Sequence, residues 1–135
     1  MQAAARLGIC FDLYPETNKK NLHDLVYDIL QKAKQSRIIT GFAYDIDHHD
    51  EDEMWTCITL VLEFNGKDTT RDTIKHYFKI LDNIFKLFEE HGFHNPDITT
   101  EELFIRLKEG KTIELYDCIL SRVRNKLEIA NVGKA

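Results

Sequence analysis

Cysteine, proline and glycine are scarce in this sequence: its 135 residues include three cysteines, two prolines and six glycines. The cysteines, Cys10, Cys57 and Cys118, form no CxxC pair, and their number is odd. A disulfide framework or a zinc ribbon needs paired cysteines, so the sequence predicts free thiols in a reduced, cytoplasmic protein. Cys10 and Cys57 are expected to be small buried apolar residues without a reactive role.

Long apolar runs and an excess of basic charge are missing too. The longest apolar run falls far short of a membrane span, and the first residues lack the basic region and apolar core of a signal peptide. The net charge of -5 implies an acidic surface that repels nucleic acid and anionic membranes. We therefore expect neither nucleic acid nor a membrane as a partner.

Motifs for catalysis and cofactor binding are absent as well. The sequence has no G-x-S-x-G elbow, no H-E-x-x-H, no Walker loop and no dinucleotide fingerprint, so it predicts no cofactor. It also lacks internal repeats and low-complexity linkers. A chain of this length without linkers is predicted to form a single domain over residues 1–135, large enough to bury a core without disulfides.

Alternation of apolar and polar residues predicts strands near residues 7–13, 38–46 and 54–64. The last of these has apolar residues on both sides, which is typical of a strand covered at least in part on both faces. Between the strands, apolar residues recur at helical spacing over 22–33 and over 69–91. The second helix has an apolar arc of about half its circumference, wider than one sheet face requires.

The C-terminal third leaves two interpretations open. Thr99 and Glu102 fit a capping box, which predicts a short helix after a turn at 94–97. The run LFIRL at 103–107 also alternates like a strand, so a fourth strand there is the competing interpretation. In both cases a final helix is expected from Thr112 onward.

The predicted order is strand, helix, strand, strand, helix, followed by the open C-terminal third. This order is typical of a βαββα sandwich in the α+β class, a ferredoxin-like half or split βαβ arrangement. We therefore predict a sheet of three or four strands, with the first strand beside the third, helices on one face and further helices at the C-terminus. Such folds host many unrelated activities and assign no function.

Residues 43–55, AYDIDHHDEDEMW, hold six carboxylates and two adjacent histidines between two apolar runs. Hard cations bind clustered carboxylates, and histidine adds transition metals to the choice. An EF-hand fails because Asp50 stands where glycine is needed and Thr56 where glutamate is needed. The pattern therefore favours an exposed hairpin tip without a structural metal. The weak metal candidates are His48, His49 and Asp50 in this turn, and His91 and His94 after the long helix.

Two functions of different classes fit these features. The apolar surplus and the missing motifs favour a non-enzymatic protein-interaction module, which self-associates as a homodimer or docks on a partner protein. Its expected interface residues are Ile80, Leu87, Trp55, Tyr116, Leu120 and Val123. The alternative is a small metal-dependent hydrolase of the phosphodiester type that uses carboxylates near strand ends. Its expected catalytic residues are Asp12, Asp45 and Asp47.

Overall fold

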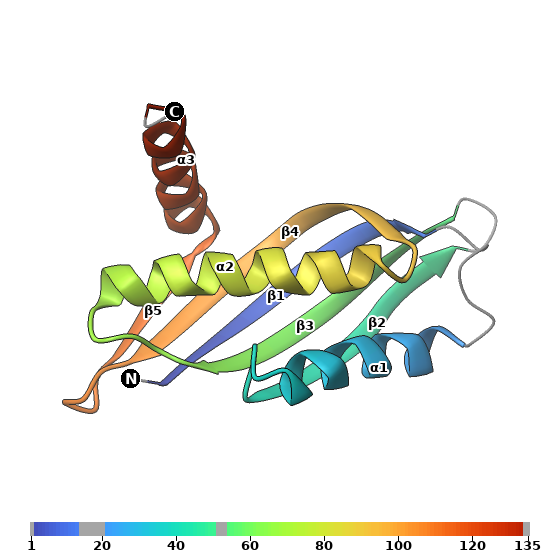
Figure 1. Ribbon diagram of the computed structural model, residues 1–135, viewed down its shortest axis with the longest axis horizontal. Helices are drawn as coiled ribbons and strands as arrows, with labels where there is room; N and C mark the ends of the chain where they lie inside the picture. Colours follow the sequence, from blue (N-terminus) through green and yellow to red (C-terminus); the bar gives the residue numbers. More distant parts are fainter. Residues whose placement is uncertain (1, 14–20, 51–53, 134–135) are drawn as a thin grey trace.

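The computed structural model describes residues 2–13, 21–50 and 54–133, with the backbone alone at 118 and 127–133. These residues form one antiparallel sheet in the order β2-β3-β1-β4-β5, together with three helices (Figure 1). In chain order the elements are β1 (Gln2–Leu13), α1 (Leu22–Gln35), β2 (Gly41–Asp50), β3 (Trp55–Asn65), α2 (Thr70–Glu89), β4 (Phe93–Arg106), β5 (Thr112–Tyr116) and α3 (Asp117–Gly133).

Strand β1 lies at the centre of the sheet, and its apolar side chains alternate along most of its length. Leu7, Ile9 and Phe11 point to one face and are at most 2% exposed. β1 pairs with β3 on one side and with β4 on the other, so Leu7 lies opposite Leu60 of β3. The predicted placement of the first strand beside the third is confirmed.

Helices α1 and α2 cover this apolar face of the sheet (Figure 1). A side chain caps the start of each helix. Asn21 Oδ1 accepts a hydrogen bond from the Asp24 N–H at 2.8 Å, and Thr69 Oγ1 accepts one from the Asp72 N–H at 3.0 Å. The wide apolar arc of α2 has a local explanation, because α2 packs against α1 as well as against the sheet. Ile80, at the margin of that arc, is only 2% exposed within its own chain.

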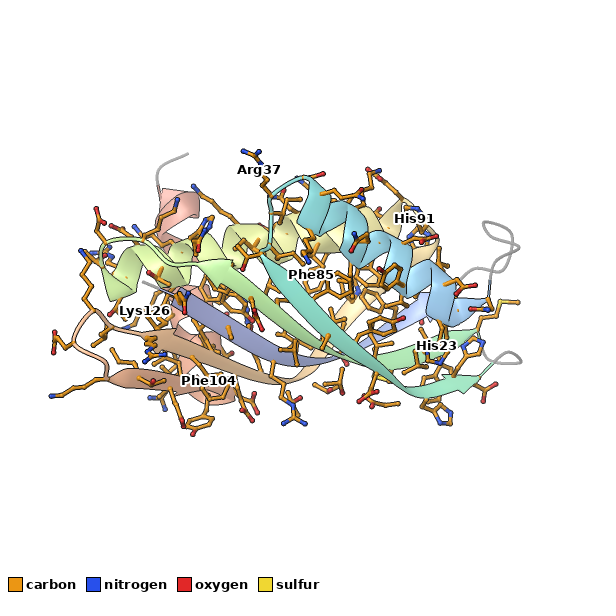
Figure 2. The ribbon with its side chains drawn as sticks, turned by 90° about the horizontal axis from the view of Figure 1, so that it is seen from below. His23, Arg37, Phe85, His91, Phe104 and Lys126 are labelled. Carbon is orange, nitrogen blue, oxygen red and sulfur yellow. A yellow bond between two sulfur atoms is a disulfide. The ribbon has the colours of Figure 1, made fainter. Side chains whose placement is uncertain are left out.

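The opposite face of the sheet carries no helix in the part of the chain that the structure describes, and we call it the open face. Figure 2 shows Phe85 between the helices and the sheet, and Phe104 on the open face. Val61 and Phe104 on this face are half-buried, whereas their neighbours on the covered face are buried. The described helices therefore cover β3 on one side only, although its sequence suggested cover on both.

Helix α3 leaves the end of β5 and extends away from the rest of the molecule (Figure 1). Its first turns rest on β4 and β5, where Leu120 is fully buried and Val123 is half-buried. None of the described helices combines the length and apolarity needed to cross a membrane.

The C-terminal third departs most from the sequence-based prediction. Residues 93–106 form a strand where a turn and a short helix were predicted, and residues 112–116 form another where the last helix was to begin. The capping box fails because residues 93–106 pair with β1 at eleven positions, and tertiary context of this kind overrides local preference. The competing strand at 103–107 had the right type but covers only the end of β4. The predicted ferredoxin-like sheet of three or four strands is therefore wrong, and a five-stranded α+β fold replaces it.

Candidate functional site

A disulfide bond between Cys10 and Cys57 joins β1 to β3 on the open face. The two residues lie directly opposite each other in the antiparallel register, with Cα atoms 4.0 Å apart. Both cysteines are half-buried. The expectation of two free, buried thiols is therefore wrong, because the register brings together two side chains that lie 47 positions apart in the sequence.

An aromatic pair and a polar pair lie beside the disulfide on the same face. The His48 ring stacks on the Trp55 ring with centroids 4.5 Å apart, and His48 is the register partner of Cys57. Thr59 Oγ1 donates a hydrogen bond to Asp47 Oδ2 at 2.5 Å. We call this group the disulfide patch; it consists of Cys10, Asp47, His48, Trp55, Cys57 and Thr59.

On the β4 side, the backbone of β1 approaches two hydroxyl groups closely at Gly8. A Cβ atom on Gly8 would lie 2.7 Å from both Thr99 Oγ1 and Thr100 Oγ1, so only glycine fits there. The Gly8 N–H donates a hydrogen bond to Thr100 Oγ1 at 3.1 Å, at a point where the pairing of β1 with β4 shifts register. Gly8 and Cys10 point to the same face of β1, so no β1 side chain lies next to Cys10 on the Gly8 side.

A second polar cluster lies on the covered face, where α3 meets α2 and β4. Glu101 of β4 is 3% exposed and accepts a hydrogen bond from the Tyr77 hydroxyl at 2.5 Å. Arg124 of α3 binds both oxygens of this carboxylate, at 3.0 Å and 2.7 Å, and its guanidinium lies 4.5 Å from the centroid of the Phe78 ring. The Glu101 N–H donates to the Asp117 carboxylate. We call Tyr77, Glu101 and Arg124 the carboxylate clamp.

The carboxylate clamp is saturated, which points to a structural role. Both oxygens of Glu101 are engaged, and no described buried side-chain nitrogen or oxygen lacks a hydrogen-bond partner. Burial, followed by the negative charge of Glu101, raises the pKa of Tyr77, so the phenol keeps its proton and donates. The clamp therefore anchors the first turns of α3 to the body of the protein through charge-assisted hydrogen bonds.

The carboxylates predicted for a hydrolase do not assemble into a metal site. Asp12 of β1 accepts a hydrogen bond from Asn95 Nδ2 at 2.8 Å, while Asp45 and Asp47 lie on β2, on the far side of β3. Within the described ranges, no group of three or more histidine, cysteine or acidic residues is placed to hold a metal ion. The predicted metal-dependent hydrolase is therefore not supported.

The other predicted site residues are scattered. His48 belongs to the disulfide patch, His49 and Asp50 follow it on β2, and residues 51–53 of the acidic turn lie outside the described residues. A His91 Nδ1 atom lies 2.9 Å from the Leu87 carbonyl oxygen, and His94 is the register partner of Asp12.

The predicted interface residues lie in different surroundings. Ile80 and Leu120 are buried inside the chain, Leu87 and Val123 pack at the margin of the core, and Trp55 belongs to the disulfide patch. Tyr116 is 48% exposed. Their role in an interface, and the homodimer itself, stay predictions.

Comparison with known proteins gives little further guidance. No family model matches this chain, and no curated protein does. One solved structure that matches is a phage SAM lyase in complex with S-methyl-5'-thioadenosine, with a TM-score of 0.35 and 11% sequence identity over 86% of this chain and 90% of that one. The prediction of a non-enzymatic interaction module finds no support in these comparisons and is withdrawn. A similarity this weak assigns no reaction to the present chain.

Proposed function

We propose that this protein undergoes reversible thiol–disulfide exchange at the Cys10–Cys57 bond. The observation that carries the proposal is the position of the bond, on a sheet face that no described helix covers. A disulfide exchanges by direct attack of a thiolate on one of its sulfur atoms, so access to the bond is the first requirement. Both cysteines are half-buried, in contrast to the buried residues directly behind them.

The exchange balances as a two-electron transfer from a partner dithiol. A thiolate of the partner attacks one sulfur, the Cys10–Cys57 bond breaks, and the released cysteine leaves as a thiolate that takes up a proton. The second thiol of the partner then attacks the mixed disulfide and releases the other cysteine. The products are two thiols on this protein and a disulfide on the partner.

His48 is the residue of this protein placed to assist the leaving group. It is the register partner of Cys57, and its ring is held on the open face by stacking on Trp55. The Thr56 hydroxyl donates to the His48 carbonyl oxygen at 2.9 Å and fixes the strand at this point. A protonated imidazole next to a cysteine stabilises its thiolate, which eases departure of the sulfur.

The sheet does not depend on the disulfide for its assembly, so both redox states are expected to fold. β1 and β3 pair at eleven positions, and behind the two cysteines Ile9 and Ile58 are fully buried in the core. Small proteins that need disulfides to fold lack such a core. We also propose the cytoplasmic location that the sequence predicts, because disulfides in a reducing compartment are usually transient and either catalytic or redox-sensing.

Titration in glutathione redox buffers tests the proposal. The Cys118→Ser variant leaves only Cys10 and Cys57 to follow, by thiol alkylation and mass spectrometry. We expect full, reversible reduction without denaturant and an unchanged far-ultraviolet circular dichroism spectrum. In the Cys57→Ser, Cys118→Ser variant, Cys10 should trap glutathione as a mixed disulfide. If the bond is reduced only at denaturant concentrations that unfold the chain, it is a structural disulfide and the proposal is wrong.

His48→Gln is a second, milder test in the Cys118→Ser background. We expect a severalfold slower reduction by dithiothreitol, since the leaving thiolate loses its neighbouring imidazole. His49→Gln, at the next position of β2, is the matched control and should leave the rate unchanged. Equal rates in the two variants would remove His48 from the mechanism without affecting the proposed exchange.

A further inference from the structure

A hollow of about 510 Å³ lies at the start of α2, remote from the disulfide patch. Its charged lining consists of Lys67, Asp68, Asp72, Lys75, His76 and Lys79. The lining residues belong to the connection between β3 and α2 and to the first turns of α2. This connection lies at the left of Figure 1. It is thus independent of the proposed thiol–disulfide exchange.

The three lysines of this hollow have no carboxylate partner among the described residues. Among the described residues, ion pairs join Lys32 to Glu90 at 3.8 Å and Arg124 to Glu101 at 2.7 Å. Neither pair involves a lysine of the hollow. Asp68 and Asp72 line the same hollow but lie outside ion-pair distance of the three ammonium groups. The ammonium groups therefore remain available to a ligand.

His76 reports the local electrostatic potential. Burial is the first cause that lowers its pKa, and the positive charges of Lys67 and Lys79 are the next. The imidazole therefore lies where the positive charges of Lys67 and Lys79 act on it. The His76 ring packs edge-on against the Phe64 ring, with centroids 6.0 Å apart. This contact fixes the position of the imidazole beside the hollow.

The negative charge of the protein as a whole does not cancel the potential either. Strand β2 carries Asp45, Asp47 and Asp50 in its second half. The end of β2 lies at the opposite end of the long axis from the start of α2 (Figure 1). Charges separated by more than about 8 Å are largely screened at physiological ionic strength. A chain with a net charge of -5 can therefore still present a locally positive hollow.

We propose that this hollow binds a small anion with two linked phosphoryl groups. Lysine ammonium groups are compact charges that bind phosphate oxygens from several directions, and the three in this hollow outnumber its two carboxylates. A single phosphate would leave part of the hollow unfilled. Nucleic acid is the poorer fit, because a track of many phosphates would have to continue onto a mainly acidic surface. The amides at the start of α2 are not needed, since Thr69 already caps the Asp72 N–H.

Proton NMR of the His76 imidazole, titrated with inorganic pyrophosphate, tests this proposal on the wild-type chain. We expect saturable binding and an upward movement of the His76 pKa, because a bound anion offsets the repulsion by Lys67 and Lys79. Inorganic phosphate should bind at least tenfold more weakly. The Lys75→Gln, Lys79→Gln variant should lose at least tenfold in pyrophosphate affinity, whereas Lys86→Gln, further along α2, should retain it.

Thermal melting of each variant, followed by circular dichroism, separates loss of binding from loss of the fold. The substituted lysines make no ion pair among the described residues, so the variants are expected to fold. Vesicles containing phosphatidic acid provide a second arm. Binding to vesicles without binding of pyrophosphate would overturn the proposal in favour of a lipid surface. The absence of a saturable pyrophosphate response, or an equal loss of affinity in Lys86→Gln, would also overturn it.

Discussion

The disulfide patch and the carboxylate clamp lie on opposite faces of one sheet, and they differ in what surrounds them. Glu101 of the clamp is 3% exposed, and each of its oxygens is held by a neighbouring donor. Cys10 and Cys57 of the patch are half-buried, and no described helix covers them. A buried charge must be paired because water cannot solvate it, whereas a half-buried disulfide is under no such constraint.

The difference shows where chemistry with a partner is feasible in this fold. A cluster with all its donors and acceptors engaged under two helices can position an element, as the clamp positions α3, but it offers nothing to an incoming molecule. The patch offers a bond that can break and a neighbouring imidazole. This difference supports a structural role for the carboxylate clamp and the proposed exchange at the disulfide patch.

Replacing one phenylalanine on each face with alanine should give the largest difference in stability between the two faces. Phe88 of α2 is fully buried and stacks on Phe11 with centroids 5.1 Å apart, whereas Phe104 on the open face is half-buried. Phe88→Ala should lower the free energy of unfolding by about 3–5 kcal/mol through lost burial and a residual cavity. Phe104→Ala should cost about 1 kcal/mol or less, measured by urea unfolding.

The same pair of variants also bears on the predicted homodimer. If a second copy covers the open face in solution, Phe104→Ala should lower the mass measured by light scattering, and its cost in stability should depend on protein concentration. A cost for Phe104→Ala that matches that of Phe88→Ala at every concentration would contradict the distinction between the two faces.

Removing the Arg124 guanidinium from the clamp should have the next largest effect on the free energy of unfolding. Arg124→Met leaves the Glu101 carboxylate buried without its bidentate partner, and such a change costs about 3 kcal/mol. Arg122→Met, at an exposed position on the same helix, should stay within about 0.5 kcal/mol of the wild type in urea unfolding. Equal effects of the two variants would show that the clamp does not anchor α3.

The pH dependence of stability should show the smallest effect. The pKa of His76 is lowered in the folded protein, so the unfolded chain binds more protons between that value and the ordinary value of 6.5. The free energy of unfolding should therefore decrease as the pH falls through this window. His76→Asn should reduce the difference between urea midpoints at pH 7.5 and pH 5.5. An unchanged difference would show that the pKa of His76 is not lowered in the folded protein.

Local patterns were sufficient for the first two thirds of the fold. The alternation of Leu7, Ile9 and Phe11 predicted β1, and the helical spacing from Ile74 to Phe88 predicted α2, because each repeats its pattern for longer than any competing signal. Ile9 and Cys10 point to opposite faces of β1, but the sequence left open which face each cysteine occupies. The candidate site was missed because alternation says nothing about which residues lie opposite each other.

The sequence by itself determined the apolar face of β1 and the buried side of α2, because side-chain spacing along one element decides both. Only the tertiary structure decided that residues 93–106 are a strand, since the polar half from His94 to Glu102 has no clear alternation and is held by backbone pairing with β1. It also decided the partners of Cys10 and of Glu101. Those contacts join positions 47 and 23 residues apart, to Cys57 and to Arg124 respectively, and register and packing between elements select them.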